Sequence, residues 1–218
     1  MQPVLIYCYD AWCGWCYGFS PVMQQLNHEF RNMLTIEVLS GGMILPEQPV
    51  HVGVMASYVL ENYERVEETA GVTFGEDYLW HMRHADISDW FPSSEKSAIA
   101  LSIFKEYQPE HQVDFIADLQ KALFIEGRDL TDDEAYRHLL YKYAIDETIF
   151  YERLHSEVFR QKAHDEFALC RQLKATGFPQ LMLQTSDNKI YLINRGYEHY
   201  ETVSKKINQI ILTQYNIN

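Results

Sequence analysis

Two cysteines separated by two residues, Cys13 and Cys16, stand where an apolar run meets a helical pattern. Residues 4–9 before them are apolar and rich in residues that favour strands. After them, the apolar side chains of one helical face recur at spacings of three and four: Phe19, Val22, Met23, Leu26 and Phe30. A second strand-like segment follows at residues 35–39 and ends at Ser-Gly-Gly. The chain therefore opens as strand–helix–strand with the thiols at the first junction, which is more specific than a lone cysteine pair.

The position of this pair predicts its chemistry. Two thiols at the first turn of a helix can close a small disulfide ring without large movement of the backbone. Cys13 is near unpaired backbone N–H groups and the positive end of the helix dipole, which favour a thiolate. A thiolate attacks a disulfide sulfur, and Cys16 would then attack the mixed disulfide and release the substrate. We therefore predict Cys13 as the nucleophile and Cys16 as the resolving partner.

The middle of the chain has a helical pattern interrupted by glycines and prolines. One helix is predicted to begin at Ser93 or Ser94. Another is predicted at Thr131, which has the spacing of a capping box with Glu134. A third, long helix is predicted to begin near Asp146. This region therefore forms a helical insertion within the chain.

The last part of the chain returns to strands. Residues 180–184 and 190–193 flank the turn-forming sequence Ser-Asp-Asn, which predicts a β-hairpin. Residues 200–212 then place apolar side chains on one helical face. The predicted order is β-α-β, a helical insertion, and β-β-α, which is an α/β fold.

A proline begins the first strand of this hairpin. Pro179 cannot donate a ladder hydrogen bond, so its position needs a structural reason. A cis bond between Phe178 and Pro179 would supply one, and it would leave the Phe178 backbone free to pair with an extended substrate segment. We therefore predict Phe178 and Pro179 as substrate-binding residues.

These features resemble one known family. Residues 11–17, Ala-Trp-Cys-Gly-Trp-Cys-Tyr, followed by the helical insertion and by Gly-Phe-Pro at 177–179, resemble the DsbA family of thioredoxin-fold proteins. Within it, the sequence is most similar to the cytoplasmic DsbA-like bacterial proteins that lack a signal peptide. Residues 38–43 and 127–130 also resemble stretches of those proteins.

The resemblance implies a fold and an activity. The fold would be a thioredoxin fold formed by residues 1–45 and 174–218, with residues 46–173 as an inserted α-helical domain. The activity would be thiol–disulfide exchange on protein or peptide substrates, with glutathione as a further candidate partner. The resemblance implies no bound metal and no organic cofactor.

The residues around the thiols would tune the site. Trp12 and Trp15 flank the cysteines and are predicted to shape the substrate surface, and Gly14 and Trp15 form the dipeptide between the thiols. This dipeptide contains no histidine that could stabilise a thiolate. Asp10 would disfavour a thiolate if it lay nearby in space. We therefore expect a weaker oxidant than the DsbA proteins known for strong oxidation, or a reductase or isomerase.

Metal binding is an alternative interpretation of the cysteines. A zinc site needs four ligands, and no second cysteine pair follows nearby. Cys8, Cys13, Cys16 and a distant Cys170 do have the ligand spacing of plant-type 2Fe–2S clusters. However, Cys8 lies in an apolar run and Cys16 opens a helix, so we predict no metal site. Cys8 and Cys170 are instead predicted to be small buried hydrophobic residues.

Two other functions remain open from the sequence. Kappa-class glutathione transferases and hydroxychromene-carboxylate isomerases share the inserted architecture, but they usually carry serine where Cys13 stands and lack the second thiol. A glutathione-dependent isomerase or transferase is therefore one alternative. A non-catalytic metal-binding or redox-sensing protein is the other.

Charge and hydropathy exclude other classes of partner. A formal net charge of −13 disfavours nucleic-acid binding, because phosphate contacts need clustered Lys and Arg. No stretch approaches the roughly 18 uninterrupted apolar residues of a membrane span. Residues 1–7 lack the basic and apolar regions of a signal peptide. We therefore expect a cytoplasmic protein with no nucleic-acid and no membrane partner.

Overall fold

The computed structural model describes the backbone of residues 2–215 and contains one four-stranded sheet with the order β2-β1-β3-β4. Its strands are β1 (Val4–Tyr9), β2 (Thr35–Ser40), β3 (Gln180–Gln184) and β4 (Ile190–Arg195). Strand β1 pairs in parallel with β2 and antiparallel with β3, and β3 pairs antiparallel with β4. The first and last parts of the chain therefore meet along β1 and β3, as the α/β prediction requires.

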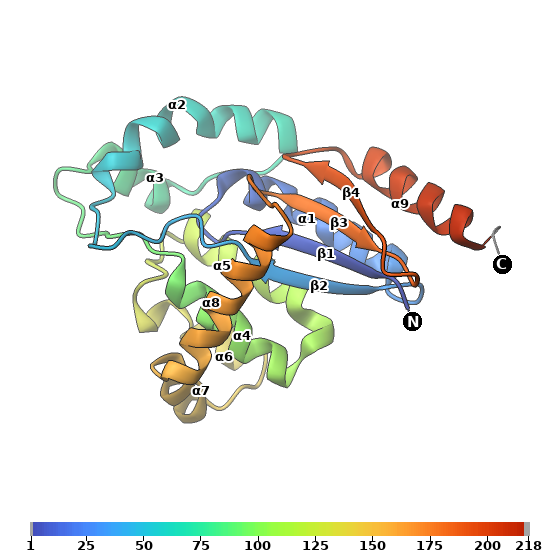
Figure 1. The fold of residues 1–218 in the computed structure, drawn as a ribbon. Coiled ribbons are helices and arrows are strands. Elements are labelled where there is room, and N and C mark those ends of the chain that lie inside the picture. Colours follow the sequence, from blue (N-terminus) through green and yellow to red (C-terminus); the bar gives the residue numbers. More distant parts are fainter. Residues whose placement is uncertain (1, 216–218) are drawn as a thin grey trace.

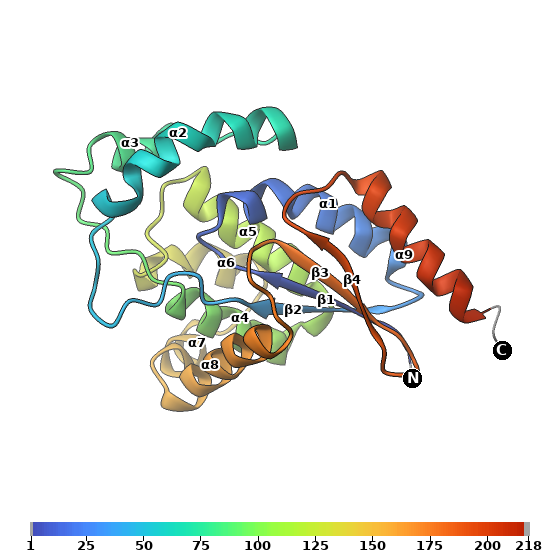
Figure 2. The ribbon, with the colours of Figure 1, turned by 45° about the horizontal axis from the view of Figure 1, so that its top comes forward.

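Helices cover both faces of this sheet (Figures 1 and 2). Helices α1 (Gly14–Phe30) and α9 (Tyr200–Tyr215) lie on one face, and α8 (Glu157–Gln172) lies on the other. Side chains of β1 contribute to the packing on both faces of the sheet, because successive side chains of a strand point to opposite sides. Tyr7 belongs to the larger core that α1 helps to form, whereas Cys8 packs in a smaller cluster with Cys170 of α8.

The chain between β2 and β3 is helical, as its pattern predicted. Its α-helices are α2 (Gly53–Ala70), α3 (Glu76–Arg83), α4 (Glu95–Tyr107), α5 (Gln112–Phe124), α6 (Arg137–Lys142), α7 (Glu147–Leu154) and α8. Single 3₁₀ turns are formed by Pro109–His111 and Asp133–Ala135. Helices α2 and α3 pack together above the start of α1 (Figure 1). Within residues 2–215, no helix is long and apolar enough to cross a membrane.

Two helix boundaries differ from those that the sequence predicted. The capping box at Thr131 is wrong, because the Thr131 hydroxyl donates to the Asp129 carboxylate and the Asp132 side chain accepts from the Glu134 N–H instead. A 3₁₀ turn forms there, and α6 begins only at Arg137. Such short side-chain-to-backbone bonds compete with helix formation.

The long helix predicted from Asp146 is two helices. Asp146 does cap α7, but that helix ends at Leu154. The Ser156 hydroxyl then accepts from the Phe159 N–H and begins α8. A serine in extended conformation satisfies the first free N–H groups of a new helix, so the chain turns at this point rather than continuing.

The other predicted elements are confirmed. Strand β1 has the predicted bounds, α4 begins directly after Ser94, and β3 and β4 form the predicted hairpin. Asn188 in its turn has a φ of 63°, a left-handed conformation that asparagine tolerates. Helix α9 begins at Tyr200, as predicted.

Candidate active site around Cys13 and Cys16

Cys13 lies at the N-terminus of α1. It is the N-cap residue with φ −86° and ψ 110°, and its Sγ accepts a hydrogen bond from the Cys16 backbone N–H at 3.3 Å. The backbone N–H of Cys13 donates to the carbonyl of Asp10 at 3.2 Å, which closes the turn after β1. The Cys13 sulfur therefore occupies the position of a capping oxygen, where backbone N–H groups and the helix dipole favour negative charge.

Cys16 lies one turn further along the helix and is fully buried. Burial raises the pKa of the Cys16 thiol well above its ordinary value, and the hydrogen bond between its thiol and Cys13 raises that pKa further. Cys16 is therefore a protonated thiol at neutral pH.

Asp10 organises the loop that carries Cys13. Its Oδ1 accepts from the Trp12 N–H at 3.0 Å and from the Ser94 hydroxyl at 3.0 Å, and its Oδ2 accepts from the Met43 N–H at 2.7 Å. Burial raises the pKa of the Asp10 carboxyl, although these donors oppose that shift. A hydrogen bond with the Asp10 backbone lowers the pKa of the buried Cys16 thiol, and the negative charge of the Asp10 carboxylate opposes this by raising it. The role of Asp10 in joining three segments had no signal in the sequence.

The Phe178–Pro179 peptide bond is cis, which confirms the prediction. The Phe178 carbonyl oxygen lies 3.6 Å from Cys13 Sγ. The Phe178 side chain packs closely over Gly41 at the end of β2, where an added Cβ would lie only 2.1 Å from the ring. The structure therefore brings Phe178 and Pro179 beside the thiols.

The two predicted tryptophans differ in their environment. Trp12 is buried, and its Nε1 donates to the Ser93 carbonyl at 2.8 Å. Trp15 is half-buried, and the guanidinium of Arg65 lies 6.0 Å from its ring centre. A Cβ at Gly14 would lie 3.4 Å from the Phe74 ring, an ordinary contact, so the available space does not require glycine there.

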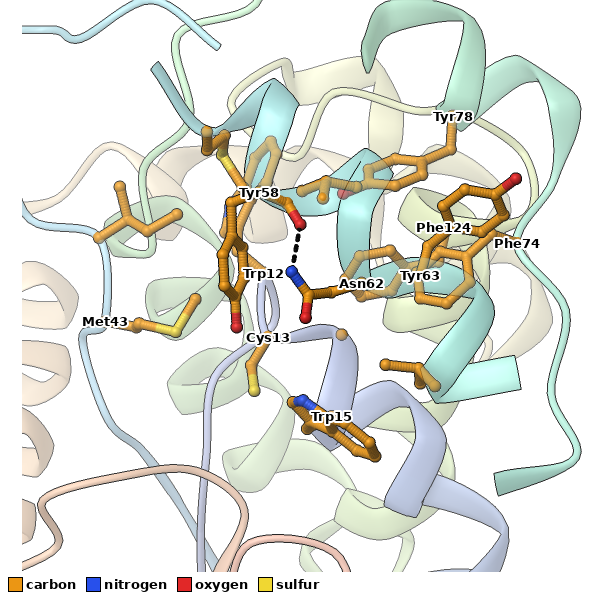
Figure 3. A pocket seen from close by; sticks show the side chains of 15 residues that line it. Trp12, Cys13, Trp15, Met43, Tyr58, Asn62, Tyr63, Phe74, Tyr78 and Phe124 are labelled. Carbon is orange, nitrogen blue, oxygen red and sulfur yellow. Dashed lines mark hydrogen bonds between the residues drawn. The ribbon is translucent and has the colours of Figure 1, made fainter. Parts of the chain in front are cut away.

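A cavity of about 290 Å³ lies beside Cys13 (Figure 3). Its walls come from the active-site turn, the chain after β2, and helices α2, α3 and α5. Tyr58, Asn62 and Tyr63 of α2 line it together with Trp12 and Trp15. The sequence did not identify this cavity, because its walls come from segments distant in the chain.

The remaining cysteines lie apart from this site. Cys8 and Cys170 are buried on the opposite face of the sheet, which confirms that they are small core residues. Among residues 2–215, no group of three or more His, Cys, Asp or Glu side chains is arranged to hold a metal ion. The 2Fe–2S spacing of the four cysteines therefore has no matching cluster in space.

Solved structures resemble this chain along its whole length. A candidate protein disulfide isomerase from Nitrosomonas europaea matches with a TM-score of 0.84 at 24% identity, over 98% of this chain and 99% of that one. The cytosolic disulfide reductase DsbM from Pseudomonas aeruginosa matches with a TM-score of 0.73 at 24% identity, over 99% and 100%. A 2-hydroxychromene-2-carboxylate isomerase matches with a TM-score of 0.67 at 10% identity, over 99% of each chain.

No protein-family model and no curated protein sequence gives a significant match to this chain. At identities of 24% and below, the structural likeness establishes the fold. This chain therefore has the thioredoxin fold with an inserted helical domain, in the form shared by DsbA-like disulfide oxidoreductases.

Proposed function

We propose that this chain is a thiol–disulfide oxidoreductase that exchanges a Cys13/Cys16 dithiol with protein or peptide disulfides. One observation carries the proposal: Cys13 Sγ caps α1 and accepts from the Cys16 N–H, while the Cys16 thiol is buried behind it. A nucleophilic thiolate and a protonated resolving thiol are the two states that dithiol exchange requires.

The reaction follows from the positions of the two sulfurs. The Cys13 thiolate attacks one sulfur of a substrate disulfide, the S–S bond breaks, and the other sulfur leaves as a thiolate. Cys16 then loses its proton and attacks the Cys13 sulfur of the mixed disulfide. The Cys13–Cys16 disulfide forms, and the second substrate thiol is released. Two electrons pass from the protein to the substrate, and the reverse sequence oxidises a dithiol.

The structural neighbours support this chemistry and suggest its setting. Their names describe a disulfide isomerase and a cytosolic disulfide reductase, and the reductase has also been solved with glutathione. We therefore propose glutathione as a redox partner and the cytoplasm as the compartment. The net charge of −13 supports a protein that does not bind nucleic acid.

A glutathione redox titration tests the proposal. Tryptophan fluorescence would follow the transition, since Trp12 and Trp15 line the site beside the thiols, and alkylation with mass measurement would count the thiols at each end. We expect one two-thiol transition that disappears in Cys16→Ser, and loss of disulfide turnover in Cys13→Ser. The midpoint potential distinguishes an oxidant from a reductant.

A buried cysteine in β1 provides a matched control. Cys8→Ala removes a buried thiol on the opposite face of the sheet, and it should leave the transition intact. Turnover retained in Cys13→Ser would overturn the proposal. Thiols that react only after chelation of a metal would do the same and would favour a metal-binding protein.

The likeness to the chromene-carboxylate isomerase supports a second candidate, a glutathione-dependent isomerase or transferase. The cavity beside Cys13 would suit an apolar acceptor for glutathione. This candidate predicts glutathione conjugation that persists in Cys16→Ser, because conjugation needs no resolving thiol. Loss of all turnover in Cys16→Ser would exclude it.

A further inference from the structure

The cavity beside Cys13 differs from an ordinary surface hollow in its chemistry. Of the 15 described residues that line it, none is Lys, Arg, His, Asp or Glu. Most of its wall is aromatic or aliphatic, and in Figure 3 the Cys13 side chain lies at one end of the cavity, near Trp15. The Asn62 amide is the one side-chain amide among these residues, and its Nδ2 donates to the Tyr58 carbonyl at 2.8 Å.

These walls restrict what can enter. A carboxylate or an ammonium group would lose its hydration and meet no charged partner inside, which is costly. An apolar group would gain free energy from leaving water. The volume of about 290 Å³ lies at the lower end of ligand pockets, so it suits one side chain rather than a folded segment. Met43 and Met55 in the wall are flexible and can adjust to different shapes.

The chain also provides a hydrogen-bond acceptor for the backbone of a bound peptide that carries such a side chain. The Phe178 carbonyl oxygen lies 3.6 Å from Cys13 Sγ, so it is within reach of the N–H groups of a peptide whose cysteine is bonded to Cys13. Cavity and carbonyl therefore lie beside the same sulfur.

We propose that this cavity binds an aromatic or branched aliphatic side chain next to the substrate cysteine, and so selects peptide disulfides by that neighbour. The proposal rests on the proposed function of Cys13 and Cys16. In the reaction, Cys13 displaces one peptide thiolate and bonds to the other peptide. Cys16 then releases the second peptide thiol, and the protein becomes the Cys13–Cys16 disulfide.

Symmetric disulfides of short peptides test this selection. The probes are dimers of acetyl-X-cysteine amide with X as Phe, Ser or Glu, together with hydroxyethyl disulfide, which has no side chain for the cavity. The reduced protein is mixed with each probe in a single turnover, and the loss of the protein's own thiols, followed by alkylation and mass measurement, gives the second-order rate. We expect the Phe probe to react about tenfold or more faster than the Ser probe, from the burial of one aromatic side chain. The Glu probe should be slowest.

Two valines of α2 provide a matched pair of variants. Val59 lines the cavity, whereas Val54 on the same helix is 78% exposed and does not line it. Val59→Trp should fill the cavity and reduce the Phe-over-Ser ratio to about one, and Val54→Trp should leave the ratio unchanged. The rate with hydroxyethyl disulfide is measured for each variant, and the Phe and Ser rates are divided by it, so that a change in the reactivity of Cys13 itself cancels.

A second variant tests the same cavity by a change of charge, without adding bulk that could disturb its packing. Asn62→Asp has nearly the same size and places a carboxylate in the cavity, so it should lower the Phe rate relative to the hydroxyethyl disulfide rate and reduce the Phe-over-Ser ratio. Thermal unfolding checks that each variant folds. Equal Phe and Ser rates in the original chain, or a preference that survives both Val59→Trp and Asn62→Asp, would overturn the proposal. Failure of the proposed function would appear differently, as full reactivity of Cys13→Ser with every probe.

Discussion

The sulfur of Cys13 lies 3.6 Å from the carbonyl oxygen of Phe178, although 165 residues separate them in the chain. The sheet explains this contact. Strands β1 and β3 are antiparallel neighbours in which Cys8 is opposite Gln180, so the end of β1 meets the start of β3. The loop after β1 leads into Cys13 and the start of α1, and the Phe178–Pro179 bond directly precedes β3.

Gly41 supports this contact from the end of β2. A Cβ there would lie 2.1 Å from the Phe178 ring, so Gly41→Ala should displace Phe178 and its carbonyl. We expect disulfide exchange to slow by about tenfold, because small shifts of groups near a reacting atom are costly. Exchange rates with a peptide disulfide measure the effect. Gly177→Ala is the control, since an added Cβ there meets no described atom within 4 Å. Equal rates for Gly41→Ala and the original chain would contradict the prediction.

Asp10 should be essential for the stability of the active-site loop. Asp10→Ala would leave the buried Trp12 N–H, the buried Ser94 hydroxyl and the partly buried Met43 N–H without their acceptor. Each buried unsatisfied donor costs about 1–3 kcal/mol, so the two buried donors predict a loss of about 2 kcal/mol or more in the free energy of unfolding. Urea denaturation measures it. Asp132→Ala removes an exposed cap and should cost only about 1 kcal/mol. Equal losses in the two variants would refute the role of Asp10.

The raised pKa of Cys16 predicts a pH-dependent second step. Because only the Cys16 thiolate attacks the mixed disulfide, decay of that intermediate should accelerate about tenfold per pH unit from pH 7 to 9. Trapping the Cys13-linked intermediate with acid and measuring its mass at several times gives this rate. A decay rate that does not change over this range would show that Cys16 is already ionised.

The same pKa predicts how stability changes with pH. The unfolded thiol ionises near pH 8.5, whereas folded Cys16 holds its proton to higher pH. Above about pH 8.5 the unfolded state therefore binds fewer protons than the folded state, and stability of the reduced protein falls as pH rises. The oxidised protein has no thiol at this position and should lack this part of the loss. Urea unfolding of both forms between pH 7.5 and 9.5 tests the difference.

Lys105 should hold the helical insertion against the sheet. Its ammonium lies 2.7 Å from a Glu37 oxygen of β2 and 2.8 Å from a Glu166 oxygen of α8, and Glu166 also accepts from the Ser40 N–H. Lys105→Met leaves two carboxylates without their cation, so we expect a loss of about 3–5 kcal/mol in the free energy of unfolding. Lys105→Met with Glu166→Gln should recover much of that loss, because it removes the most buried unpaired charge. A double variant as unstable as the single one would contradict this explanation.

The sequence predicted the sheet and its two flanking helices well because their signals are local. Alternating or continuous apolar residues define β1 and β3, and the spacing of apolar residues defines α1 and α9. The helical insertion was predicted in type but less well in its boundaries. The Thr131 hydroxyl donates to the Asp129 carboxylate, and the Ser156 hydroxyl accepts from the Phe159 N–H. Periodicity of the apolar residues predicts neither of these local hydrogen bonds. The division into residues 1–45 with 174–218 and residues 46–173 stays a prediction.

The sequence by itself determined the proximity of Cys13 and Cys16, because two positions three apart at a helix start are neighbours through backbone geometry alone. Only the tertiary structure decided what surrounds them. The Phe178 carbonyl, the acceptor role of Asp10 and the apolar cavity each join segments distant in the chain. Strand pairing and helix packing bring these segments together. No local sequence pattern predicts which distant side chains will line the same cavity.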